Sequence, residues 1–225
     1  MIPVTPAVEP ASFDEHVRKR GEVAIQRLLG QAVNAPGRRP SATYTRPEDI
    51  PASKYPAYWT EVRSSDGKSA LDDMMDAYGQ FCAYLALRIE PATGSPTVDH
   101  FVPKERDWRL VYEWSNYRLS AGCVNGAKGT DEVIDPFLVQ PGWFELDLDT
   151  FLVRRGQAAP VAEHGRVQQT LKILNLRQCV AQRGDFIMRY RARQIDLAHV
   201  AIYAPFVASE LLRQSSSCTV TGGEL

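Results

Sequence analysis

One stretch of the chain constrains the fold more than any other. Residues 97–129 read TVDHFVPKERDWRLVYEWSNYRLSAGCVNGAKG. Two short strand-like segments, TVDHF and YRLS, are separated by a long polar loop, and the following NGAKGTDEV has the composition of a short helix or turn. The window therefore predicts a small local unit of two strands and a helix, against which the remaining segments must pack.

The flanking segments add helices and one hairpin. FDEHVRKRGEVAIQRLLG predicts a helix that ends at Gly30, residues 31–60 read as an irregular connector, and SALDDMMDAYGQFCAYLALRI predicts an amphipathic helix capped by Ser69. WFELDLDTFLVRR alternates as a hairpin does, and residues 163–213 predict two or three helices, with Pro205 interrupting the last. We expect an α+β protein with three parts, residues 1–68, 69–136 and 137–225.

Composition excludes several classes of protein. The chain has 225 residues, 44% of them hydrophobic and 24% charged, and a formal net charge of −1, so any nucleic-acid binding would need local positive patches. Its four cysteines form no CxxC pair, which fits a reducing compartment better than a disulfide scaffold. The N-terminus lacks the features of a signal peptide, and no apolar run reaches membrane-spanning length. We expect a soluble cytoplasmic protein that does not associate with membranes.

The window also carries a set of side chains suited to phosphodiester hydrolysis. Asp99-His100 is followed sixteen residues later by Asn116, nine further on by Asn125 and three further on by Lys128. Neutral imidazole removes a proton from water near neutral pH, which makes His100 the candidate base. Carboxylate and amide oxygens are ligands that Mg²⁺ prefers, as Asp99 and Asn125 would supply.

Other polar residues of the window have candidate supporting roles. Asn116 offers both donors and acceptors and could hold the loop backbone so that His100 is oriented. Three cations are candidate contacts to substrate phosphates: Lys104, Arg118 and Lys128. Taken alone, Asp99-His100 favours a loop Asp beside a satisfied histidine, because a two-residue match recurs by chance; together with both Asn, Lys128 and the flanking sequence, it favours the nuclease site.

The order of these segments resembles a family of nucleases. CAYLALRI, VDHFVPK, YEWSNYRLS, NGAKG and DPF follow the order of a bacterial HNH endonuclease family often paired with ATPases, which includes the nuclease subunit of Septu-type antiphage systems. The resemblance implies a ββα-metal module within residues 69–136, catalytic His100 and Asn116, and one Mg²⁺ or Mn²⁺ per site bound by Asp99 and Asn125. It also implies a DNA substrate, an ATPase partner and a role in antiviral defence. One module cuts one strand, so a homo-oligomer is one way to cleave both.

The chain departs from this family at its structural zinc site. Where many members have two CxxC pairs, this sequence reads Cys82 with Leu85, and Ala121 with Val124. Tetrahedral zinc needs four ligands, so we expect no structural zinc there. Cys123 then reads as a small buried hydrophobic residue.

Two alternative functions remain open from the sequence. The first is a non-catalytic subunit that binds nucleic acid or an ATPase on an HNH scaffold. The second is a nuclease that acts on RNA such as tRNA, because no residue of this sequence indicates whether the 2′-hydroxyl, which distinguishes RNA from DNA, is recognised. Residues 166–193 add seven Lys or Arg against one acidic residue. This basic stretch fits a solvated helix face and a DNA-backbone contact equally well.

Overall fold

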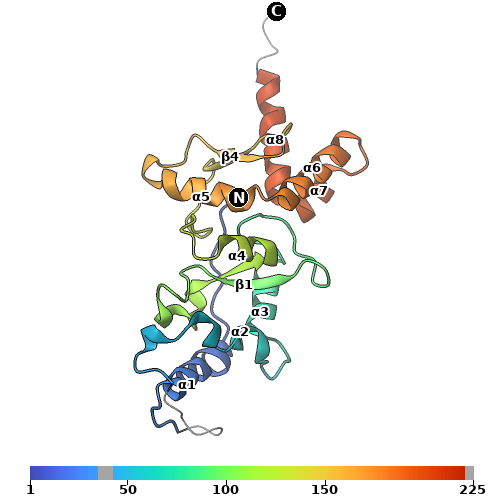
Figure 1. Ribbon diagram of the computed structural model, residues 1–225. Helices are drawn as coiled ribbons and strands as arrows, with labels where there is room; N and C mark the ends of the chain where they lie inside the picture. The colour runs from blue at the N-terminus through green and yellow to red at the C-terminus, as the bar shows by residue number, and fades with distance from the viewer. Residues whose placement is uncertain (35–42, 221–225) are drawn as a thin grey trace, which may run out of the picture. The chain divides into compact units, whose positions relative to one another are not determined.

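The computed structural model describes residues 1–34 and 43–220 of the chain (Figure 1). Within these ranges the protein is of mixed α and β structure, with eight α-helices and two two-stranded sheets, which confirms the expected α+β class. None of the described helices is both long and apolar enough to cross a membrane.

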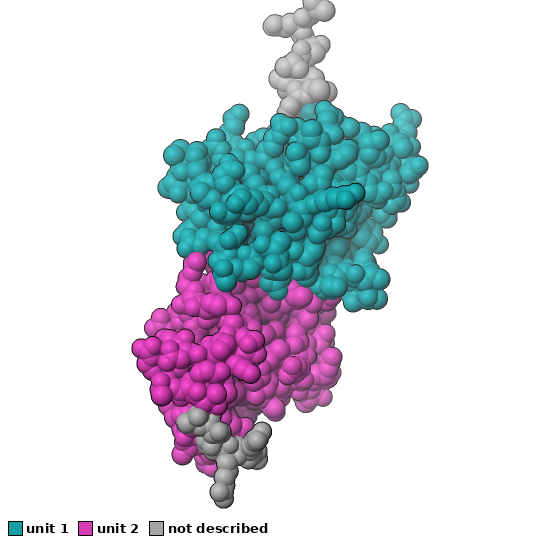
Figure 2. All heavy atoms as spheres, viewed as in Figure 1, with its two compact units in different colours: residues 1–5, 80–95, 120–225 teal, residues 6–79, 96–119 magenta. Residues whose placement is uncertain are grey.

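The chain divides into two compact units that are interleaved along the sequence (Figure 2). Unit 1 contains residues 1–5, 80–95 and 120–225, and unit 2 contains residues 6–79 and 96–119. These units differ from the three parts expected from the sequence, because the segment 69–136 contributes to both of them. Boundaries read along a sequence follow local composition, whereas compact units depend on which distant segments pack together.

Unit 2 begins with the predicted N-terminal helix. A π-helical turn, Asp14–Arg18, leads into α1 (Lys19–Leu28), and Gly30 follows with a φ of 71° that ends the helix where predicted. The Arg18 guanidinium pairs with Glu9 at 2.6 Å and with Glu113 at 3.2 Å. This network ties the N-terminal helix to the loop that precedes the second strand.

The connector after α1 is more ordered than the sequence predicts. Part of it, residues 35–42, lies outside the described residues. The rest forms two 3₁₀ turns and a short helix, α2 (Tyr58–Glu61), which carries the buried Trp59. Trp59 joins an aromatic cluster in unit 2, whose members are Phe13, Tyr55, Trp59, Tyr112, Trp114 and Tyr117.

The next helix, α3 (Ala70–Ala77), starts as predicted and ends early. The Ser69 side chain accepts from the Asp72 backbone N–H, and the Asp72 carboxylate accepts from the Ser69 N–H, so both residues form a capping box. The sequence predicts a helix through residue 89. Instead, Gly79 and Gln80 have positive φ values of 56° and 67°, which a right-handed helix cannot accommodate.

The apolar residues beyond that break form a tight turn in unit 1. Phe81 and Arg88 form an antiparallel bridge, and the Cys82 backbone N–H donates to the Leu87 carbonyl at 3.0 Å. Every residue from Cys82 to Leu87 is buried. Because a fully buried turn is apolar throughout, it contains apolar residues three and four positions apart, which is also the spacing of an amphipathic helix.

The expected order of two strands and a helix is present. Strand β1 (Pro96–His100) pairs with β2 (Tyr117–Ala121), and α4 (Gly122–Lys128) follows β2 directly. α4 begins before the predicted segment NGAKGTDEV and ends at Gly129, which has a φ of 50°. Between the strands the loop contains two 3₁₀ turns, Trp108–Leu110 and Trp114–Asn116.

The remainder of unit 1 is a hairpin and four helices. Strands β3 (Phe144–Leu146) and β4 (Val153–Arg155) are antiparallel, which confirms the predicted hairpin. The sequence predicts two or three helices here, whereas the described residues form four. Pro205 starts the last helix instead of interrupting it. They are α5 (His164–Leu174), α6 (Arg177–Arg191), α7 (Leu197–Tyr203) and α8 (Pro205–Val220).

Candidate active site around His100

The imidazole of His100 is held at the end of β1 in a defined tautomer. His100 is buried, with 8% of its surface exposed, and its Nε2 atom lies 2.9 Å from the carbonyl oxygen of Val111. A carbonyl oxygen can only accept, so Nε2 carries the hydrogen and the neutral ring keeps its lone pair on Nδ1. In this tautomer Nδ1 is the basic nitrogen of the ring.

Two aromatic rings fix the plane of the imidazole. Trp59 meets it edge-on with centroids 4.6 Å apart, and Tyr117 does so at 5.0 Å. The Tyr117 hydroxyl also donates to the Val111 carbonyl at 2.9 Å, so this one oxygen accepts from both side chains. The ring is therefore positioned by packing and by hydrogen bonding together.

Asn116 holds the loop between the strands closed. Its Oδ1 accepts from the Val102 N–H at 2.8 Å, while its Nδ2 donates to the carbonyls of Val102 and Leu110, both at 3.1 Å. The Asn116 carbonyl accepts from the Phe101 N–H at 2.9 Å. These bonds join the residues just after His100 to the residue just before Val111. They provide the loop-holding role suggested for Asn116, whereas its part in catalysis remains a prediction.

Lys104 is the one predicted phosphate contact that is partly exposed. Its ammonium lies 4.3 Å from the centroid of the Trp59 ring, and this ring also packs against His100. Burial lowers the pKa of Lys104 below its ordinary value. Lys104 and His100 thus contact the same indole, and this places a cation close to the candidate base.

The other two predicted phosphate contacts are buried. Arg118 is 4% exposed, and it donates to the carbonyls of Ser115 and Tyr117 at 2.8 Å and 2.9 Å. Lys128 is 1% exposed, on the last turn of α4. Arg118 therefore stabilises the start of β2, and neither cation is placed to contact a phosphate chain from solvent. Sequence reveals the charge of a residue and not its burial, which is why all three cations looked equivalent.

The two predicted metal ligands belong to different units. Asp99 lies on β1 in unit 2 and is buried, with 2% of its surface exposed, whereas Asn125 lies on α4 in unit 1 and is half-exposed. Among the described residues, no three His, Cys, Asp or Glu side chains form a group that could hold a metal ion. Asp99 would offer a carboxylate and Asn125 an amide, and their sharing of one ion remains a prediction. Hard oxygen donors of this kind fit Mg²⁺, which commonly keeps several waters and takes few protein ligands.

The four positions that the resemblance would assign to zinc ligands, Cys82, Leu85, Ala121 and Val124, belong to unit 1. The Cys82 sulfur accepts from the Ala121 N–H at 3.5 Å, and Cys82, Leu85 and Ala121 line one pocket. Val124 is fully buried. At two of these positions, Leu85 and Val124 are buried hydrophobic residues. The prediction for Cys123 is wrong, because this thiol is exposed and lines the same pocket.

Most cations of the basic stretch 166–193 are engaged locally. Arg183 is buried and donates to the carbonyls of Phe151 and Leu174 and to Asn175 Oδ1, and burial lowers its pKa to about 10. Three others form ion pairs: Arg166 with Glu132 and Glu163, Arg189 with Asp185, and Arg191 with Asp149.

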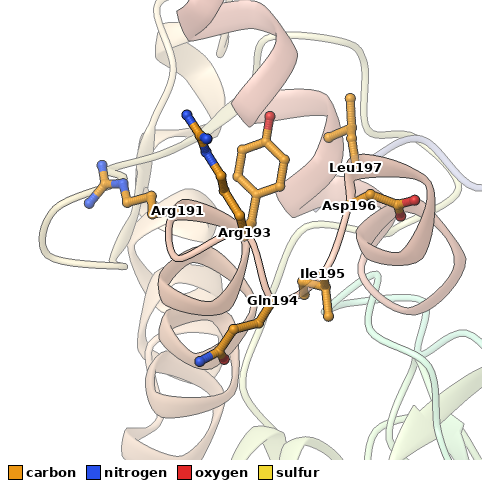
Figure 3. A pocket seen from close by; sticks show the side chains of 7 residues that line it. Arg191, Arg193, Gln194, Ile195, Asp196 and Leu197 are labelled. Carbon is orange, nitrogen blue, oxygen red and sulfur yellow. The ribbon is translucent and has the colours of Figure 1, made fainter.

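An open pocket of about 610 Å³ lies at the end of this stretch, beside the turn after α6. Arg191 and Arg193 line it, and in Figure 3 their side chains extend in different directions from that turn. Because much of the positive charge is neutralised by neighbours and these two arginines do not converge, the solvated-face interpretation is favoured over a continuous DNA-binding face.

Sequence reasoning missed two parts of the site. Trp59 lies in a connector rich in Pro and Ser, where no periodicity marks it, although a lone Trp in such a segment suggests an anchor. The carbonyl of Val111 is a backbone group, and its role as acceptor depends on the loop conformation.

Comparisons of the chain with protein-family models, with curated proteins and with solved structures found no match.

Proposed function

We propose that this protein is a metal-dependent endonuclease of the HNH type that hydrolyses DNA phosphodiester bonds. The observation that carries the proposal is the Nε2–H···O=C bond from His100 to Val111, at 2.9 Å. It leaves the lone pair of the neutral ring on Nδ1, at the residue where the sequence independently predicts a general base.

In this mechanism His100 Nδ1 takes a proton from water, whose oxygen forms the new bond to phosphorus as the bond to the leaving oxygen breaks. Asn116 keeps the loop closed, so the imidazole does not lose its orientation between turnovers. Lys104 neutralises a substrate phosphate as a point charge. Asp99 and Asn125 would hold Mg²⁺ or Mn²⁺, and this ion would stabilise negative charge on the phosphate and on the leaving oxygen.

A second observation supports the HNH type. If Cys82, Leu85 and Ala121 occupy former zinc-ligand positions, they should lie together although about forty residues separate the two segments. Lining of one pocket by these three residues agrees with that requirement. No structural zinc is expected there, and elemental analysis of the purified chain measures it directly.

The assay that tests the proposal uses supercoiled plasmid and a structured RNA as parallel substrates. Each is incubated with the full chain in Mg²⁺, in Mn²⁺ and in EDTA. We expect nicking of the plasmid that needs the divalent ion and stops in EDTA. Cleavage of the RNA but not of the plasmid would mean that RNA is the substrate instead of DNA. If neither is cleaved with any ion, a non-catalytic subunit is favoured.

We also propose that an ATPase partner controls this activity, that the enzyme serves antiviral defence in the cytoplasm, and that two copies cooperate when both strands are cut. The motivation is electrostatic, since non-specific DNA affinity comes mainly from cationic contacts to phosphates and the chain has a formal charge of −1. Co-purification with an ATPase, and cleavage measured with and without that protein and ATP, test the proposal. Fast cleavage at physiological salt that neither addition changes would contradict it.

A further inference from the structure

Three cysteines from distant segments meet at one pocket of unit 1. They are Cys82 in the turn after α3, Cys123 in the first turn of α4, and Cys179 in the first turn of α6. The pocket has a volume of about 260 Å³, and all three thiols are free. Neither the proposed hydrolysis nor its metal ligands use any of them.

Two of these thiols are suited to react with each other. Cys123 and Cys179 line the same pocket, although 56 positions separate them in the chain, and Cys123 is among the groups that raise the pKa of Cys179. Cys123 is exposed and Cys179 is buried. The Cys82 sulfur is instead occupied by the backbone N–H of Ala121. One accessible thiol therefore has a protected thiol beside it, and this is the arrangement in which a first oxidation can be resolved within the protein.

We propose that Cys123 and Cys179 form a redox-active pair that closes into a reversible disulfide by exchange with a low-molecular-weight disulfide such as oxidised glutathione. The Cys123 thiolate attacks one sulfur of glutathione disulfide, which forms a mixed disulfide and releases one glutathione thiolate. The Cys179 thiolate then attacks the Cys123 sulfur and expels the second glutathione. The two thiol protons of the protein end on the two glutathione molecules, and the two electrons reduce the glutathione disulfide.

The surroundings of Cys179 agree with this order of events. Burial raises the pKa of Cys179 to about 12, with further contributions from the neighbouring Cys123, while the Arg183 guanidinium acts in the opposite direction. Cys179 is thus a poor first nucleophile.

The test uses the full chain with Cys218→Ser, so that the cysteine near the C-terminus does not contribute. The protein is equilibrated with mixtures of reduced and oxidised glutathione, quenched with acid and alkylated. Intact mass and peptide mapping then identify the linkage. We expect a Cys123–Cys179 disulfide that dithiothreitol reverses. In Cys179→Ala the reaction should stop at glutathione on Cys123, and in Cys123→Ser neither product should form.

Cys82→Ala is the matched control, with Cys82→Ser as its substitute if the alanine variant does not fold. Either should leave the Cys123–Cys179 disulfide unchanged. Three results would overturn the proposal: persistence of the mixed disulfide on Cys123 in the chain that retains Cys179, a disulfide that includes Cys82, or a stoichiometric metal ion that protects Cys123 and Cys179 from oxidation.

Discussion

His100 Nε2 lies 2.9 Å from the carbonyl oxygen of Val111, across a loop that Asn116 closes from inside. The relationship joins the last residue of β1 to the middle of the loop and determines which imidazole nitrogen can act as a base. It also makes His100 part of the packing of unit 2. Substituting it with alanine would therefore remove a base and a buried ring together, so a more conservative change is needed to separate the two effects.

Asn116→Ala should destabilise unit 2 and lower cleavage. It leaves the Val102 N–H and two carbonyls without their side-chain partner, which costs about 2–4 kcal/mol in the free energy of unfolding. Asn175→Ala is a matched control, because Asn175 makes similar bonds to Val153 in unit 1. Urea unfolding and a cleavage assay below the transition should show stability lost in both variants and activity lost chiefly in Asn116→Ala. Equal activity in both would contradict the loop-holding role.

Gly21→Ala should be destabilising although alanine favours helices. A Cβ at Gly21 in α1 would lie 2.1 Å from the Tyr112 ring, which is buried, so the helix or the aromatic cluster must shift. Overpacking of this kind costs about 1–3 kcal/mol. Gly165→Ala in α5 is the control, since a Cβ there meets nothing within 4 Å and should add up to about 1 kcal/mol of stability. The contact between α1 and Tyr112 would be in doubt if Gly21→Ala matched or exceeded the wild type.

Unit 2 should lose stability at alkaline pH. Burial raises the pKa of Tyr55 to about 12 and raises those of Tyr112 and Tyr117 as well. In the unfolded chain tyrosine ionises near pH ~10, so above that pH the unfolded state loses its protons first. The stabilisation is complete below about pH 10 and declines as pH rises toward about 12.

Tryptophan fluorescence can follow this loss, because Trp59, Trp108 and Trp114 lie in unit 2 and only Trp143 lies in unit 1. Denaturant titrations at increasing pH should give a falling midpoint, and Tyr55→Phe should make the decline less steep. A midpoint that stays constant through this range, or an unchanged decline in Tyr55→Phe, would show that Tyr55 does not ionise as its burial implies.

Asp99→Asn and Asn125→Ala should weaken divalent-ion binding rather than proton transfer. Both reduce the oxygen donors available to the ion, so cleavage in Mg²⁺ should fall and a higher concentration of Mn²⁺ should restore part of it. If Mn²⁺ rescued neither ligand variant, or rescued a His100 variant equally well, the separate roles would be wrong.

Lys104→Ala should instead weaken DNA binding and reduce its salt dependence by about one phosphate contact.

Short sequence patterns predict several elements of the fold. The strands around Asp99 and Tyr117, the cap at Ser69 and the stop at Gly30 are each encoded within a few neighbouring residues, and the structure has them where the sequence predicts. The helix predicted through residue 89 failed because the burial of a compact turn has the same spacing as a helix face. Whether Asp99, His100 and Asn125 act in one site remains a prediction.

What the sequence could not provide depends on contacts between distant segments. Nothing near Arg118 distinguishes a buried cation from an exposed one, and Cys123 and Cys179 line one pocket only when α4 and α6 are folded. Trp59 reaches His100 from a segment without periodicity, 41 positions earlier in the chain. These residues define the surroundings of the candidate site, and they could be identified only from the folded chain.

The most direct measurement compares the plasmid-nicking rate of the wild type with that of His100→Gln in Mg²⁺. A glutamine amide can still donate toward the Val111 carbonyl and fills much of the ring's volume, but it cannot accept a proton as imidazole does. The rate should fall by about 10²–10⁴-fold, while the urea midpoint stays near that of the wild type. A folded His100→Gln protein that nicks plasmid at the wild-type rate would show that His100 is not the base.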